Sequence, residues 1–229
     1  MDDHSVESTL AACEHTLAAG APVDLGASGF WRAVAATKRR PDLVARFADR
    51  IARIDRAAFE RAVPLRVPAT LGAAVLVAGA AAGLGLLAVA PALDHPLRDL
   101  AVLAGAAALD GVTHGLAHLA IGAAVGIRFT HAFVQLPKKP QPGFKIDYAT
   151  YLRTPARARA WMHASGAIAT KLTPFAVLLY GLAIGVEGWV VGALLALGAL
   201  QIATDLLFSV KTSDWKKFKR EMKLARVAR

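Results

Sequence analysis

The sequence is poor in several residue types, and each shortage restricts its structure. A single cysteine excludes an internal disulfide. Residues 1–66 carry charges throughout and lack the apolar core of a secretory signal, so we expect this N-terminal region, which contains Cys13, not to be removed as a signal peptide. Acidic residues number 17 against 27 Lys and Arg, for a formal charge of +10. Aromatic residues make up only 7%.

Apolar residues, by contrast, are abundant. They form 55% of the chain, and the mean hydropathy of +0.43 is higher than ordinary soluble domains reach. A helix needs about 20 apolar residues to cross a hydrocarbon core of about 30 Å. Four segments are long enough, and we predict spans over residues 67–90, 100–125, 161–186 and 189–210. Only Glu187 and Gly188 separate the last two, which predicts a tight antiparallel hairpin.

These segments predict an all-α membrane protein in three parts. Residues 1–66 form a cytoplasmic or interfacial helical region, residues 67–210 a four-span membrane domain, and residues 211–229 a basic cytoplasmic tail. The loop from 126 to 160 is too short for a separate domain. Its runs IRFTHAFVQL and FKIDYATYL are rich in β-branched and aromatic residues on either side of a proline-rich turn, which indicates a small β-hairpin.

The clearest helix of the N-terminal region begins at Pro41 and Asp42. Apolar residues then recur at helical spacing against a basic face: Leu43, Val44, Phe47, Ile51, Ile54 and Phe59. The apolar stripe suits either the inner membrane surface or a position packed on the loop between spans two and three. We favour the membrane surface. Residues 5–19 are a second helix candidate.

Basic residues also predict the orientation, because Lys and Arg in short loops are retained on the cytoplasmic side. The 126–160 loop and the C-terminal tail are strongly basic, whereas the connections between the first two and the last two spans are not. We therefore expect a multi-pass cell-membrane protein with both termini in the cytoplasm. The positive charge then lies where it meets anionic lipid headgroups, and we expect no nucleic-acid partner.

The stretch DGVTHGLAHLAIG places ionisable groups inside the second span. Asp110, His114 and His118 are spaced four residues apart, so they share one helix face. A strip of glycines beside them, including Gly111, has the spacing that lets another helix approach closely. Span four supplies one further acid, Asp205. At 1.5 Å per residue, His118 and Asp205 lie about 15 Å and about 9 Å above their basic flanks, so tilt can bring them to one level.

Two imidazoles and a carboxylate are a typical ligand set for a catalytic-type zinc site. We therefore predict that His114, His118 and Asp205 bind zinc or another divalent transition metal. Alternatively, the polar groups only hydrogen-bond one another and hold the helices together. Lys171, in span three, is the strongest argument for that alternative, because an ion pair with Asp205 or Asp110 would replace the metal.

Three further residues are candidates for the same site. Asp110 is one turn before His114, where it would serve as a fourth ligand, as an acceptor for an imidazole N–H, or as a relocated general base. His131 and His163 lie near the cytoplasmic boundary and are either additional ligands or solvated interfacial side chains.

Together these residues resemble the site-2 protease family of intramembrane zinc metallopeptidases over roughly residues 100–210. The family carries two zinc-binding histidines of an HExxH motif on one helix and an aspartate two helices later. HGLAH at His114–His118 and TDLLF at Asp205 match in order and spacing, and HASGAIATK resembles the glycine-centred motif of the middle helix at Gly166. The resemblance implies a three-helix core and a zinc site.

The sequence departs from the family at the catalytic position. Gly115 replaces the glutamate that acts as general base, Leu206 replaces the glycine after the aspartate, and Thr170 stands where asparagine is common. The first hypothesis is therefore a metal-binding protein that no longer cleaves peptides and regulates a membrane-protein partner. The second is an unorthodox metalloprotease or hydrolase acting on a single-span substrate, with Asp110 or another base. The third is proton or cation transport.

Overall fold

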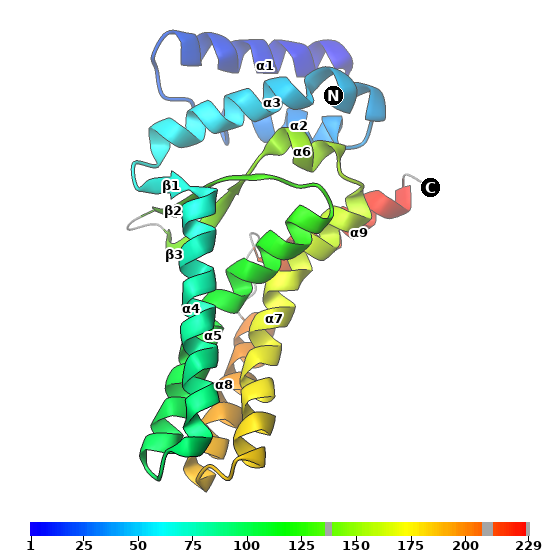
Figure 1. Ribbon diagram of the computed structural model, residues 1–229. Helices are drawn as coiled ribbons and strands as arrows, with labels where there is room; N and C mark the ends of the chain where they lie inside the picture. Colours follow the sequence, from blue (N-terminus) through cyan, green and yellow to red (C-terminus); the bar gives the residue numbers. More distant parts are fainter. Residues whose placement is uncertain (136–138, 208–212, 228–229) are drawn as a thin grey trace. The chain divides into compact units, whose positions relative to one another are not determined.

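The computed structural model describes residues 1–135, 139–207 and 213–227, which form two compact units (Figure 1). The N-terminal unit comprises Met1–Ala69, Gly122–Arg159 and Lys223–Arg229; the span bundle comprises Thr70–Ile121 and Ala160–Met222. The predicted loop between spans two and three thus belongs to the N-terminal unit.

Three helices bury their apolar faces against one another in the N-terminal unit: α1 (Asp3–Ala18), α2 (Phe30–Thr37) and α3 (Pro41–Ala62). Leu43, Phe47, Ile51 and Ile54 of α3 are almost fully buried, and their partners include Leu10 of α1, Phe30 of α2 and Leu152 of the 126–160 loop. The preferred membrane-surface position of this helix is therefore wrong. Its stripe is covered by protein, and the packing on the loop is confirmed.

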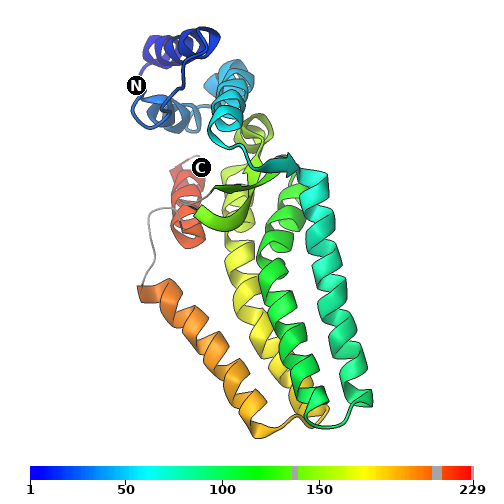
Figure 2. The same cartoon turned by 90° about the vertical axis from the view of Figure 1, so that its left-hand side faces the viewer.

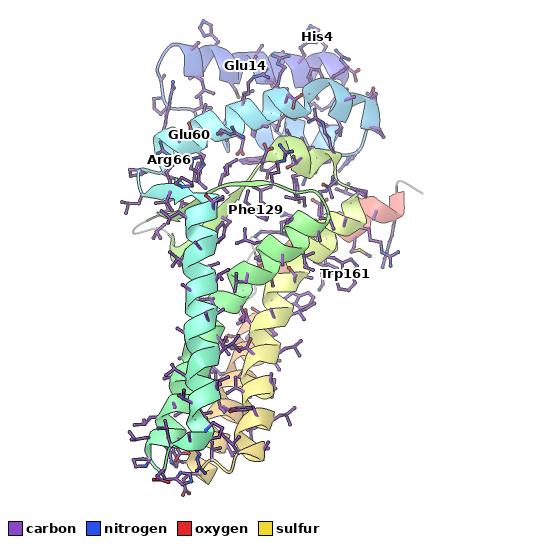
Figure 3. The ribbon with its side chains drawn as sticks, in the orientation of Figure 1. His4, Glu14, Glu60, Arg66, Phe129 and Trp161 are labelled. Carbon is purple, nitrogen blue, oxygen red and sulfur yellow. The ribbon has the colours of Figure 1, made fainter. Side chains whose placement is uncertain are left out.

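The expected hairpin is present and has a third strand. Strands β2 (Phe129–Gln135) and β3 (Lys139–Ile146) pair antiparallel, and β1 (Arg66–Pro68) adds to the free edge of β2, so the order is β1-β2-β3. Figure 3 labels Arg66 and Phe129 at the starts of β1 and β2. The turn at 136–138 lies outside the described residues.

The second run of that hairpin does not continue as a strand. Residues Tyr148–Arg153 form the short helix α6 instead, because the Asp147 carboxylate accepts a hydrogen bond from the Ala149 amide and so caps a helix start. Helix α6 contributes Leu152 to the core described above.

Within the described residues, four helices are long and apolar enough to cross a membrane: Ala69–Ala92, Leu97–Ala124, Ala156–Ala183 and Gly188–Asp205. They comprise α4 (Ala69–Val89) with the 3-10 turn Ala90–Ala92, α5 (Leu97–Ala124), α7 (Ala156–Ala183) and α8 (Gly188–Leu207). Only 11–33% of each span is buried in protein, which suits contact with lipid. The four spans and the short α7–α8 turn are as predicted; the end of span four at 208–210 lies outside the described residues.

Helices α4 and α5 approach closely through glycines that the sequence analysis did not select. A Cβ on Gly83 would lie 3.1 Å from the Gly105 carbonyl oxygen, and one on Gly105 would lie 3.0 Å from that of Gly83. Gly111, from the predicted strip, faces open space. The close approach therefore involves a part of α5 nearer its N-terminal end than the predicted strip. There Val102 of α5, Val177 of α7 and Leu194 of α8 form the buried core.

The last described helix is α9 (Asp214–Val227), which was expected only as a basic tail. In Figure 2, α8 diverges from α5 and α7 along its length, and the beginning of α9 lies back beside α7. Every exposed residue with a described side chain in α9 is basic: Lys216, Lys219, Arg220, Lys223 and Arg226.

Candidate metal centre

The candidate centre begins with the two histidines of α5. His114 and His118 are one helical turn apart, and their Nε2 atoms approach to 3.2 Å with the rings nearly perpendicular. This pairing is the one the sequence predicts.

Hydrogen-bond acceptors on α7 determine which nitrogen of each histidine ring carries the proton. His118 Nδ1 lies 2.7 Å from the Met162 carbonyl oxygen, which only accepts, so Nδ1–H is the donor. The Thr170 hydroxyl donates to the Gly166 carbonyl oxygen, so it is free to accept from His114 Nδ1 at 3.1 Å. In the neutral form of each ring, the facing Nε2 atoms therefore both present lone pairs.

The third member of the centre is Asp214, in the first turn of α9. Its Oδ2 lies 3.2 Å from His114 Nε2 and 3.2 Å from His118 Nε2, while Oδ1 accepts from the Lys217 ammonium at 2.9 Å. Burial raises the pKa of Asp214, but the Lys217 ammonium, together with a hydrogen bond from either imidazole when that ring carries a proton at Nε2, outweighs it and holds that pKa well below its usual range. The carboxylate is therefore ionised at neutral pH.

The three facing atoms form a nearly equilateral triangle with edges of 3.2 Å. With both rings in the neutral form described above, three lone-pair-bearing atoms at this spacing repel one another unless a cation lies among them. Tetrahedral zinc, with bonds of about 2.0–2.1 Å, separates its ligand atoms by about 3.3–3.4 Å. The residues present therefore fit a metal ion.

The centre is more open on one side. The side chains of His118 and Asp214 are 16% and 14% exposed, whereas that of His114 is 46% exposed. A metal bound by the three atoms would keep a fourth coordination position for water or another ligand.

Gly166 makes the position of His118 possible. A Cβ at residue 166 would lie 2.5 Å from His118 Nε2 and 2.8 Å from Cδ2, closer than atoms in proteins approach. The glycine that the sequence analysis matched to the middle-helix motif thus provides space for an imidazole.

Asp205 does not join the histidines, although the sequence predicts it as their third ligand. Its Oδ2 pairs with the Lys171 ammonium and accepts a hydrogen bond from the Trp215 indole at 3.2 Å. Among the described residues, the group within metal-ligand reach is His114, His118 and Asp214. The sequence gives the depth of Asp205 but not the rotation of α8 about its axis, and the ion pair with Lys171 is the alternative that had been considered.

The other predicted candidates also lie outside that ligand group. Both oxygens of Asp110 accept from Gln201 Nε2, at 2.8 and 2.9 Å. His163 is buried on α7. His131 lies in the N-terminal unit on β2, where its Nδ1 is 3.1 Å from Thr130 Oγ1 and its ring is 5.8 Å from that of Phe59.

Sequence reasoning missed Asp214 because the tail had been interpreted only as a topology determinant. One signal was available: Ser213 and Asp214 precede the basic run WKKFKR, and such residues are typical of a helix start. Nothing local, however, indicates that this helix lies beside α5.

Comparisons of the chain with protein-family models, with curated proteins and with solved structures found no match.

Proposed function

We propose that this multi-pass membrane protein binds a transition metal, most suitably zinc, through His114, His118 and Asp214. The observation that carries the proposal is the convergence of two imidazole lone pairs and an ionised carboxylate at 3.2 Å. Nitrogen and oxygen donors in a small triangle suit zinc better than magnesium or calcium, which prefer all-oxygen sites. The N–H bonds to Met162 and Thr170 orient both rings, as partners of metal-binding imidazoles usually do.

We further propose that the protein is a divergent, non-proteolytic relative of the site-2 proteases with a binding or regulatory role toward a membrane-protein partner. Gly115 cannot accept a proton in place of the family's glutamate. Asp110, the acid considered as a replacement base, instead accepts hydrogen bonds from Gln201. A ligand set without a placed base supports metal binding more than peptide cleavage.

The second candidate is a metal-dependent hydrolase, favoured by the exposed edge of His114. A zinc ion with an open position lowers the pKa of bound water and so makes hydrolysis accessible. Incubation with single-span substrates tests this candidate. Cleavage by the wild-type protein that is lost in His118→Ala would support it, and cleavage that is unchanged in Asp110→Asn would remove Asp110 as the base.

The experiment that tests metal binding is elemental analysis of detergent-purified protein. We expect about one zinc per chain in the wild type and none in His114→Ala/His118→Ala, because two of three ligands are removed. Asp214→Asn should lose most of the metal. Thr204→Ala is a matched control, since its exposed hydroxyl donates only to the Gln201 carbonyl oxygen. Metal-free wild type, or metal retained without the histidines, contradicts the proposal.

A further inference from the structure

An ion pair joins two spans beside the candidate centre without belonging to it. The Lys171 ammonium of α7 contacts Asp205 Oδ2 of α8 and also donates to the Ala167 carbonyl oxygen at 3.3 Å. A carboxylate inside a span is costly, so such pairs are typically retained for a role. The sequence predicts that Asp205 binds the metal. Because Asp214 takes that place in the structure, Asp205 needs another role.

The same carboxylate oxygen also contacts α9. Trp215 Nε1–H donates to Asp205 Oδ2 at 3.2 Å. Trp215 is the residue directly after Asp214, so the hydrogen bond attaches the chain to α8 one residue from the carboxylate that faces the histidines.

Aromatic contacts attach α9 to a second helix, α7. The ring of Trp215 lies 6.0 Å from that of Phe218, and Phe218 lies 5.4 Å from Trp161, which Figure 3 labels on α7. Both pairs have the edge-to-face geometry that aromatic rings favour. The first turn of α9 is thus held from α7 and α8, while its carboxylate faces α5.

From these contacts we infer that Asp205 is a positioning residue: paired with Lys171, it holds the Trp215 indole and thereby keeps Asp214 at ligand distance from His114 and His118. This inference rests on the proposed metal site. Asp205 then affects metal affinity without binding the metal. Lys171 neutralises the charge of Asp205, and Lys171 and Trp215 both donate to its Oδ2.

The test compares zinc affinity and cobalt spectra of full-length protein in lipid nanodiscs. Zinc affinity is measured by chelator competition, and Co²⁺ substituted for zinc reports the ligand set through its visible absorption. Trp215→Phe keeps the aromatic ring and removes the N–H. Trp189→Phe is the matched control, because Trp189 is exposed at the opposite end of α8.

We expect Trp215→Phe and Asp205→Asn each to weaken zinc binding by about 10- to 100-fold, the usual cost of removing a partner that orients a metal ligand. The cobalt spectrum of both variants should keep the wild-type band shape at saturation. The double variant should bind about as weakly as either single variant, since both changes break one connection. Asp214→Asn should alter the spectrum itself.

Several outcomes would overturn the inference. Wild-type zinc affinity in Trp215→Phe shows that the indole bond does not position Asp214. A changed cobalt spectrum in Asp205→Asn makes Asp205 a ligand. Trp215→Phe leaves the ion pair intact, so it decides the matter even if Asp205→Asn does not fold. Metal-free wild type refutes the proposed function and this inference together, whereas a metal-loaded wild type with an insensitive Trp215→Phe refutes the inference alone.

Discussion

At the scale of single residues, the centre depends on which atom of each side chain is free. Met162 and Thr170 use the Nδ1–H of the two histidines, and Lys217 uses one oxygen of Asp214, so the atoms left over all point at one another. The arrangement differs from polar side chains that merely hold helices together, because in a structural network the remaining donors and acceptors would be matched.

Gly166→Ala is expected to damage the centre by steric displacement alone. The added methyl group overlaps the His118 ring, which must rotate away and take Nε2 out of the triangle. Zinc affinity should fall at least about ten-fold, as for a displaced ligand. The measurement is chelator competition on purified protein. Gly111→Ala is the control, because nothing lies within 4 Å of its Cβ position, and equal losses in both variants would contradict the steric explanation.

At the scale of secondary-structure elements, α9 is the helix whose role changed most between sequence and structure. The exposed residues among its described side chains are all basic, while its acids Asp214 and Glu221 are turned inward with exposed fractions of 14% and 3%. This segregation leaves a cationic outer face on a helix that closely follows a membrane span. This face of α9 is one place where the anionic lipid contact predicted for the basic loop and tail can be tested.

We predict that anionic lipid headgroups protect α9. Hydrogen exchange of α9 amides in nanodiscs should be slower with phosphatidylglycerol than in neutral lipid, because each basic residue near an anionic surface contributes about 1 kcal/mol. Lys219→Glu/Lys223→Glu should abolish the difference, and added salt should reduce it. Arg32→Glu/Arg39→Glu makes the same charge change at exposed positions of the N-terminal unit. Equal exchange in both lipids would rule out the contact.

At the scale of the whole molecule, four candidate spans determine how the chain crosses a membrane. An even number of crossings returns both ends of the chain to one side, and the basic flanks favour the cytoplasmic side. We therefore expect the N-terminal unit, which comprises Met1–Ala69, Gly122–Arg159 and Lys223–Arg229, to lie on the cytoplasmic side.

Cysteine labelling from one side of the membrane checks this topology. Cys13 is the native cysteine and is buried. Replacing it in Cys13→Ser gives a cysteine-free protein that does not react with the label, and single exposed cysteines are then introduced into that protein. We expect Ser8→Cys and Lys223→Cys to react with a membrane-impermeant maleimide from the cytoplasmic side only, and Asp94→Cys, in the first connection between spans, from the opposite side only. Labelling of Ser8→Cys and Lys223→Cys from different sides would show an odd number of crossings.

The sequence by itself determined the features that depend on local pattern. Hydropathy and length located the four spans, and the four-residue spacing of His114 and His118 put both on one face of one helix, because helix periodicity relates neighbours along the chain. The proline-rich turn between β-branched runs likewise identified the hairpin. The third strand was not predicted, and the packing of α3 on the 126–160 loop was only the less favoured of two alternatives, since each depends on a partner far away in the sequence.

Only the tertiary structure decided which carboxylate meets the histidines. Asp205 and Asp214 are nine residues apart, and depth along a helix favoured the first. Which of the two carboxylates meets the histidines depends on the rotation of α8, on Lys171 as a competing partner and on the position of α9 beside α7. No periodic pattern in the sequence indicates any of these three features. Convergence of side chains is a property of packing between helices, so the pattern predicted the kind of site and the fold selected its third member.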